Sequence, residues 1–406
     1  MPSPDPEDFD IHDPAFAADP YPTYDRLRAD CPVVHGTKHG GYWLLTRYED
    51  VREAARDWRT YTSSVPGVTS IPVATRRTEP QLPLEVDPPL HSRYRALVNP
   101  VFSQARIDQL RPRVQRLAGE LAAALLSTLR YGRAADLVRD YAEPLSIGAL
   151  AAFTGLPAED GPRWLEWERR LFDVHNREDG ARATEEINAY IEALVADRRA
   201  RPRDPASGDF ISQLLASEVD GQWLTDSEVR AFCQLQFGAG FETTADAVSL
   251  TLLYLMQHPE ASAALASESA LHQPAIEEFL RFSTPIQIFG RNATRDLDLR
   301  GRRIPKGDVV AISYGSANHD PSVFPDPETC VLDRFQGPTP ARHLTFGAGV
   351  HLCLGAPLAR LQLGVTLELF TREVPPLALA GDPTFKPRGD RRGLSALPVC
   401  LAESAS

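Results

Sequence analysis

The segment between Phe346 and Gly355 carries the side chains best suited to chemistry. It reads FGAGVHLCLG, and its only cysteine, Cys353, lies directly before a predicted helix. A thiolate that binds a metal must be kept ionised, and the backbone amides at the start of a helix help to do so. Gly347, Gly349 and Gly355 remove side chains where a flat ligand would approach the backbone. The alternative for a lone cysteine is a small buried residue, but the whole pattern favours a metal-binding thiolate.

Two neighbours of Cys353 suit the same site. Phe346 can pack beside the sulfur and exclude water, which tunes the redox potential of a metal, and His351 could face the edge of the ligand. The segment resembles the haem-binding signature FGxGxHxCxG of the cytochrome P450 family at every defining position. The resemblance implies that the cofactor is haem b (iron protoporphyrin IX) and that Cys353 is its iron ligand.

A second motif, AGFETT at residues 239–244, lies within a long predicted helix. Gly240 weakens a helix by about 1 kcal/mol relative to alanine, and threonine side chains compete for backbone carbonyls. Alone, the motif could be an ordinary polar face. Beside the cysteine segment it resembles the oxygen-activation motif of the same family. The resemblance implies that Ala239 lies against the haem, that Thr243 hydrogen-bonds the iron-bound peroxide, and that Glu242 feeds protons from solvent.

Basic side chains that could hold the haem propionates occur in three places. His91 and Arg95 are four residues apart on a predicted helix, so they share one face. The resemblance assigns both to the propionates, together with Arg291 and His351, because charge-assisted hydrogen bonds to carboxylates are strong. The alternative, a solvated basic face, better suits Arg93.

The stretch EFLR at residues 278–281 resembles the ExxR motif of the family. Glu278 and Arg281 share one helix face, which on its own usually means an exposed ion pair of little energetic value. The resemblance implies instead a buried pair that is tied to Arg334 in the segment before the cysteine loop.

These motifs need a mainly helical scaffold. Helices are predicted over residues 21–30, 90–102 and 107–129, over 225–257 with Thr225 and Glu228 as a capping box, and after Cys353. Strands are predicted over 41–46 and within 286–313, with turns at Arg300-Gly301 and Lys306-Gly307. The resemblance implies the cytochrome P450 fold, mainly α with a minor β region. We expect a flexible N-terminal segment at residues 1–20 and a single large domain at 21–406.

Composition limits the choice of partners and compartment. The net charge of −12 disfavours nucleic acid, which needs a basic face. The N-terminal region is rich in proline and aspartate and has no apolar run, so we expect neither a signal peptide nor a membrane anchor. Five scattered cysteines without a CxxC pair suit a reducing compartment. The expected location is therefore the cytoplasm.

The expected function is that of a monooxygenase, which inserts one oxygen atom of dioxygen into a small hydrophobic substrate. No GxGxxG follows a predicted strand, so the electrons are expected from a separate ferredoxin-type donor with its reductase. Arg342 and Arg360 flank the cysteine loop and could either meet that donor or be solvated. Alternatives are other haem-thiolate chemistry (oxidative coupling, or use of peroxide or nitric oxide) and a non-catalytic haem sensor.

The substrate pocket is the least determined part. By position in the family, it includes five apolar residues: Phe241, Ile286, Ile288, Phe289 and Leu394. Apolar linings favour a hydrophobic small molecule. Arg76 and Arg77 could hold a substrate carboxylate or be exposed loop arginines.

Overall fold

Helices make up most of the molecule. The computed structural model describes residues 9–71, 79–171, 173, 176–204, 208–337 and 341–402. Within them, the α-helices are α1 (Pro14–Ala18), α2 (Tyr21–Asp30), α3 (Tyr48–Arg56), α4 (Leu90–Val98), α5 (Gln104–Arg130), α6 (Glu143–Thr154), α7 (Gly161–Leu171), α8 (Arg177–Ala200), α9 (Phe210–Leu215), α10 (Asp226–Ala239), α11 (Glu242–Gln257), α12 (Pro259–Ser267), α13 (His272–Ser283), α14 (Tyr314–Asn318) and α15 (Ala356–Arg372).

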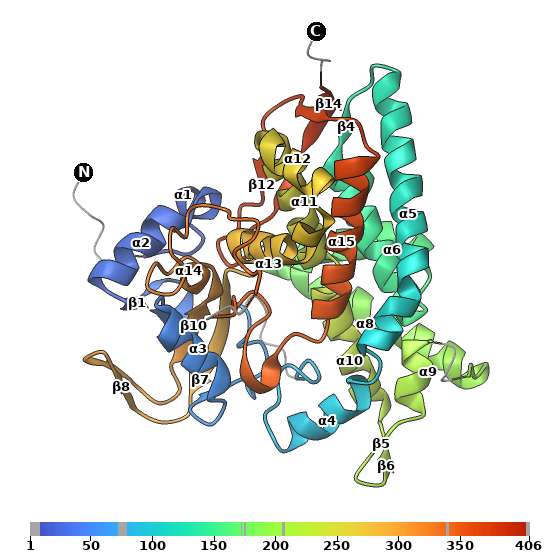
Figure 1. The fold of residues 1–406 in the computed structure, drawn as a ribbon. Coiled ribbons are helices and arrows are strands. Elements are labelled where there is room, and N and C mark those ends of the chain that lie inside the picture. The colour runs from blue at the N-terminus through green and yellow to red at the C-terminus, as the bar shows by residue number, and fades with distance from the viewer. Residues whose placement is uncertain are drawn as a thin grey trace.

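The main sheet joins the N-terminal part of the chain to the segment after α13. Its strands are β1 (Val33–Gly36), β2 (Tyr42–Leu45), β3 (Tyr61–Thr62), β7 (Ile288–Ala293) and β10 (Val309–Ser313), in the order β1-β2-β10-β7-β3. Only β2 and β10 run parallel, with Trp43 opposite Val310. Figure 1 shows this sheet and helices α1 to α3 on one side of the molecule, and α5, α6, α11 and α15 on the other.

Smaller sheets complete the β region. β4 (Ala135–Asp136) and β11 (Leu377–Leu379) flank β14 (Pro398–Leu401), and β12 (Thr384–Phe385) pairs with β13 (Leu394–Ala396). Two hairpins are formed by β5 (Glu218–Val219) with β6 (Gln222–Trp223) and by β8 (Leu297–Leu299) with β9 (Arg302–Ile304). The expected fold class is confirmed: one domain, mainly α with a minor β region.

Helix α11 lies at the centre of the helical side and packs against α6, α13 and α15. All of its residues from Thr244 to Leu253 are buried, so this mainly apolar run belongs to the core. Helix α15 begins three residues after Cys353 and has Pro357 in its first turn, where a missing amide is harmless. The cysteine is therefore placed by the start of a core helix.

The predicted helix over residues 225–257 is wrong in one respect, because it is two helices. The capping box at Thr225 and Glu228 is present, but α10 ends at Ala239 and α11 begins at Glu242. The Thr243 hydroxyl donates to the Ala239 carbonyl at 3.2 Å and takes the acceptor that a continuous helix would offer to the Thr243 amide. A side chain at Gly240 would lie 2.4 Å from the Gln236 carbonyl, so the break requires glycine.

Residues 9–20, which belong to the segment expected to be flexible, pack against the main sheet. Asp13 caps α1 through its side chain, and Ile11 and Phe16 are buried in a cluster with Tyr24. Apolar side chains in this segment thus anchor it to the sheet. Residues 1–8, and also Arg76 and Arg77, lie outside the described residues.

Among the helices of the described residues, none combines the length and the apolar character that crossing a bilayer requires.

Candidate active site

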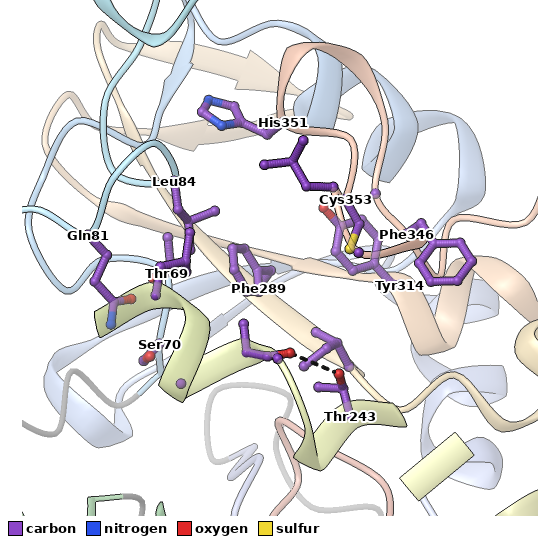
Figure 2. A pocket seen from close by; sticks show the side chains of 18 of the residues that line it. Thr69, Ser70, Gln81, Leu84, Thr243, Phe289, Tyr314, Phe346, His351 and Cys353 are labelled. Carbon is purple, nitrogen blue, oxygen red and sulfur yellow. Dashed lines mark hydrogen bonds between the residues drawn. The ribbon is translucent and has the colours of Figure 1, made fainter. Parts of the chain in front are cut away.

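A cavity of about 280 Å³ lies between the cysteine loop and the junction of α10 and α11. One water needs roughly 10–15 Å³, so the cavity is far too large to be a packing defect. Figure 2 shows the sulfur of Cys353 and the hydroxyl of Thr243 facing this space from different elements, with Gln81 and Leu84 at another wall.

Cys353 faces the cavity from the start of α15. Its backbone amide donates to the Phe346 carbonyl at 2.9 Å, which closes the loop. Protein surrounds the sulfur except on the cavity side, and this burial raises the pKa of the Cys353 thiol, while the amides of Gly355 and Ala356 and the charge of Arg95 act in the opposite direction. A thiolate here would therefore be completed by a cation in the cavity, as a haem iron would provide.

Besides Gly355, the cysteine loop contains two glycines whose surroundings differ from each other. Gly347 and Gly349 have φ of 72° and 73°, a conformation that favours glycine. Gly347 lines the cavity. Gly349 does not, and a side chain there would lie 2.8 Å from the Cα of Arg56 in α3. Gly349 thus allows the loop to pack against α3.

Arg291 on β7 is the clearest sign that the cavity suits an anion. Arg291 is 2% exposed, its guanidinium donates to the carbonyl of Gly290, and burial lowers the pKa of this guanidinium. Within the described ranges, no carboxylate lies close enough for an ion pair with Arg291. A buried guanidinium without a counter-ion is costly, so an anionic group such as a haem propionate would fit here.

Three more of the expected propionate residues meet at the same end. His91 and Arg95 of α4 and His351 of the cysteine loop line the cavity, and the rings of His91 and His351 are 4.4 Å apart. Nδ1 of His91 is buried and has no hydrogen-bond partner among the described residues. Arg95 donates to the Leu352 carbonyl at 2.8 Å. The four basic side chains and Cys353 are thus arranged around one space, as a haem with two propionates requires.

Nearby groups set the charge of the two histidines. Burial, together with the charges of His351 and Arg95, lowers the pKa of His91 to about 3, so His91 is neutral at pH 7. Nε2 of His351 lies 3.4 Å from Oδ1 of Asp87, and the other oxygen of Asp87 accepts from the Thr62 hydroxyl. Asp87 therefore orients His351 at the rim of the cavity.

Glu278, Arg281 and Arg334 form a buried ion network behind the cysteine loop. Arg281 makes two bonds of 2.8 Å to Glu278, and Arg334 contacts both oxygens of Glu278 at 3.1 Å. Glu278 and Arg281 are fully buried. Arg281 also donates to the carbonyls of Asn318 and Pro327 at 2.9 Å. The network therefore joins α13 to the irregular segment that precedes the loop.

The helix junction forms the wall opposite the cysteine loop. Ala239, Gly240 and Thr243 line the cavity. Glu242 is not among the lining residues. Its side chain is only 12% exposed, which leaves little contact with bulk water. The protein thus shields most of the Glu242 side chain from bulk water.

Glu242 belongs instead to a second buried ion network. Lys386 donates to Glu242 at 2.7 Å and to Asp246 at 2.8 Å, and Arg391 binds the other oxygen of Glu242. Glu168 of α7 lies 3.6 Å from the same guanidinium. Burial alone would raise the pKa of Glu242, but Arg391, Lys386 and Arg388 outweigh it and lower that pKa well below the usual value.

Two of the five expected substrate residues line the cavity, namely Ile286 and Phe289. The other three are corrected. Ile288 precedes Phe289 on β7 and lies on the opposite face, because side chains alternate along a strand, and it belongs to the buried cluster that contains Tyr24. Phe241 and Leu394 are buried in the main helical core.

The sequence reasoning missed the C-terminal contribution to the site. Arg388, Asp390 and Arg391 line the cavity, as do His12 and Gln81. A run of charged residues from Lys386 to Arg392 could have indicated this contribution, because the rest of the C-terminal segment is predicted to form short strands. Asp246 had a signal too, since it lies one turn after Glu242 in an apolar helix.

Comparison with known proteins gives consistent matches. The sequence profile described as Cytochrome P450 matches residues 164–373. The chain is 34% identical over 397 residues to "Cytochrome P450 monooxygenase PikC" of Streptomyces venezuelae, which covers 95% of this chain and 91% of that protein. It is 33% identical over 411 residues to "Vitamin D(3) 25-hydroxylase" of Pseudonocardia autotrophica, with 97% of each covered. The solved structure of the Bacillus subtilis 168 cytochrome P450 PksS has a TM-score of 0.84 at 31% identity and covers 97% of this chain and all of the other.

Proposed function

The chain belongs to the cytochrome P450 family of haem-dependent monooxygenases, and from this premise we propose that it transfers one oxygen atom of dioxygen to a largely apolar organic molecule. The second oxygen atom leaves as water, and two electrons come from a separate ferredoxin with its reductase. The observation that carries the proposal is that Cys353 and the buried Arg291 face one cavity.

The haem would be held by Cys353 on one side and by the basic residues at the cavity rim. When bound, a haem with a thiolate ligand favours cleavage of the O–O bond. The amides of Gly355 and Ala356 and the charge of Arg95 stabilise the negative sulfur. Phe346 lies beside it and would limit access of water (Figure 2), and Gly347 lines the same cavity.

On the opposite wall, the broken helix would supply space and a hydroxyl. Ala239 and Gly240 present almost no side chain to the cavity, and Thr243 presents its hydroxyl there. Because this hydroxyl donates to the Ala239 carbonyl, its oxygen keeps a lone pair with which to accept a hydrogen bond. Thr243 would thus accept a hydrogen bond from a protonated group at the position where dioxygen reacts, with the carboxyl group of Glu242 behind it.

The substrate would occupy the part of the cavity away from Cys353. Ile286, Phe289 and Leu84 give it apolar walls, whereas Gln81 and Arg391 are polar. A molecule that is mainly hydrocarbon and has a hydrogen-bonding group at one end would match this lining.

The surface around the cysteine loop is the proposed docking face for the electron donor. Leu352 is 46% exposed there. Arg342 is exposed, as is Arg56, which lies against Gly349 of the loop. An apolar centre with positive charges suits a small, acidic redox partner, because such encounters are guided by charge.

The test is the absorption spectrum of the reduced holoenzyme under carbon monoxide. We expect the red-shifted band of thiolate-ligated haem, and its loss in Cys353→Ala. A wild-type band at the position of histidine-ligated haem would contradict the proposal. Vitamin D3, the substrate named for one relative, is a suitable first probe for a substrate-induced spectral shift and for product formation with NADH, a ferredoxin and its reductase.

A further inference from the structure

We infer that Asp246 holds the proton that Glu242 passes on, and that Lys386 connects the two carboxyl groups. The inference rests on the proposed function, because a reaction that converts an oxygen atom to water consumes protons. Asp246 is not among the residues that line the cavity, so it acts through Glu242 and is a positioning residue.

Glu242 is poorly suited to hold the proton itself. One of its oxygens accepts from Lys386 at 2.7 Å and the other is bound by Arg391. A carboxyl group with a cation on each oxygen favours its ionised form. Glu242 can therefore pass a proton on but does not store one.

Asp246 has the opposite surroundings. It is 1% exposed, Oδ1 accepts from Lys386 at 2.8 Å, and Oδ2 is buried with no hydrogen-bond partner in the part of the chain that the structure describes. The backbone of Gly393 covers the carboxyl group so closely that a side chain there would lie 2.0 Å from Oδ1. An ionised oxygen without a partner in such a place is costly, which favours the protonated acid.

The surroundings of Asp246 also shift its pKa towards neutrality. Burial and the negative charge of Glu242 raise the pKa of Asp246, Lys386 and Arg391 lower it, and the net result is a pKa of about 7. A group with a pKa near neutrality can both give and take a proton at working pH.

A second acid, Glu168, is also next to Glu242. Burial and the charge of Glu242 raise the pKa of Glu168 well above its usual value, and Glu168 contacts both Glu242, through a side-chain hydrogen bond, and Arg391, at 3.6 Å. A guanidinium does not release protons in proteins, whereas an ammonium group does. Lys386, which links Asp246 to Glu242, can therefore carry a proton and Arg391 cannot, and the variant Glu168→Gln tests the direct contact of Glu168 with Glu242.

The step balances without a change of net charge. Lys386 gives one proton to Glu242 and takes the proton of Asp246, so it remains an ammonium ion. Glu242 becomes neutral, and Asp246 becomes a carboxylate that pairs with Lys386 in its place. The cycle closes when Asp246 takes up a proton that comes from water.

The location of the proton can be read from the infrared spectrum of the resting holoenzyme. Protonated carboxylic acids have a C=O stretch that carboxylates lack. We expect one such band to lose intensity as pH rises through about 7, to vanish in Asp246→Asn, and to persist in Glu168→Gln. Normal haem content in each variant shows that the fold is retained.

The role of Lys386 is tested by Lys386→Arg, which keeps the charge but cannot relay a proton. With NADH and a surrogate ferredoxin and reductase, we expect dioxygen consumption at pH 7 to fall at least about tenfold in Lys386→Arg and in Asp246→Asn. The wild-type rate should decline as pH rises through 7, and this dependence should disappear in both variants. The rate of haem reduction under carbon monoxide should be unchanged, since it needs no proton from this network.

Three results would overturn the inference: no titrating acid band in the wild type, a band that survives in Asp246→Asn, or a Lys386→Arg enzyme with the wild-type rate and pH profile. Failure of the proposed function is separate. It would appear as a wild-type enzyme without the thiolate-type carbon monoxide band, in which the infrared titration of Asp246 can still be measured.

Discussion

The guanidinium carbon of Arg360 lies 4.6 Å from the centre of the Phe346 ring. Glu277 fixes Arg360 there with two bonds of 2.6 and 2.7 Å and also lies 3.0 Å from His343. Arg360 thus supports the aromatic residue beside Cys353, and of the two arginines considered for the electron donor, Arg342 is the more available.

The ion pairs of the Glu277 carboxylate make the stability of the protein depend on pH. Burial would raise its pKa, but Arg360 and His343 outweigh it and lower that pKa to about 2 from 4.5. A lowered pKa means that the stabilisation is complete above pH 4.5 and is lost as pH falls through about 2. We expect the melting temperature to fall more steeply over this range in the wild type than in Glu277→Gln. Parallel curves would contradict the assignment.

Glu278→Ala should prevent stable haem binding. The change leaves Arg281 and Arg334 buried without their counter-ion, at a cost of roughly 3–5 kcal/mol, and it releases the segment that positions the cysteine loop. Haem per protein and the thermal midpoint measure the effect. The matched control is Glu260→Ala, at an exposed position at the start of α12. Normal haem content in Glu278→Ala would show that the network is dispensable.

Arg291→Met should release haem faster. Loss of one charge-assisted hydrogen bond to a propionate is worth about 1.5–3 kcal/mol, which corresponds to about tenfold or more. Transfer of haem to an excess of apomyoglobin gives the rate. Arg93→Met is the control, because Arg93 is on the same α4 as His91 but pairs with Asp220 at the surface. Equal rates for the two variants would remove Arg291 from the haem site.

Substitutions at two consecutive residues of β7 should change ligand affinity in one case and stability in the other. Phe289→Ala enlarges the cavity wall and should weaken binding of 4-phenylimidazole, a haem ligand with an apolar ring, by an amount that spectral titration reveals. Ile288→Ala should leave that affinity unchanged but lower the free energy of unfolding by about 2–5 kcal/mol, because Ile288 is a core residue. The reverse pattern would mean that the register of β7 is misassigned.

Arg342→Glu should slow reduction of the haem by a ferredoxin, most strongly at low ionic strength where charge steering is effective. Stopped-flow reduction under carbon monoxide measures the rate. Arg130→Glu, on the exposed end of α5, gives the effect of a charge reversal elsewhere. If both variants behave alike, the donor does not dock on the face around Cys353.

Motifs made the cysteine loop, the ExxR pair and the basic cavity rim predictable, because their residue types are dictated by chemistry over short spacings. The same local logic gave α2 its bounds at Tyr21 and Asp30. The direction in which single apolar side chains point was not predicted correctly. Whether Ile288 or Phe289 faces the cavity depends on the register of β7 against β10, which pairs Phe289 with Ile312.

The break between α10 and α11 shows the other limit. Gly240 and Thr243 signalled a weak point, but the end of one helix and the start of the next depend on which donor takes the Ala239 carbonyl. The contacts of Glu242 could not be foreseen either. Its two cations, Lys386 and Arg391, come from the far end of the chain, and no local pattern indicates their position.

The pairing of Trp43 with Val310 has a consequence for synthesis of the protein. On the ribosome, β2 emerges long before its partner β10, and at about 5–20 residues per second the wait lasts roughly ten to fifty seconds. During this time the apolar face around Leu44 and Leu45 has no β10 to cover it, which favours chaperone binding. The cysteine loop is translated later still, so haem is expected to enter a nearly finished chain rather than to nucleate it.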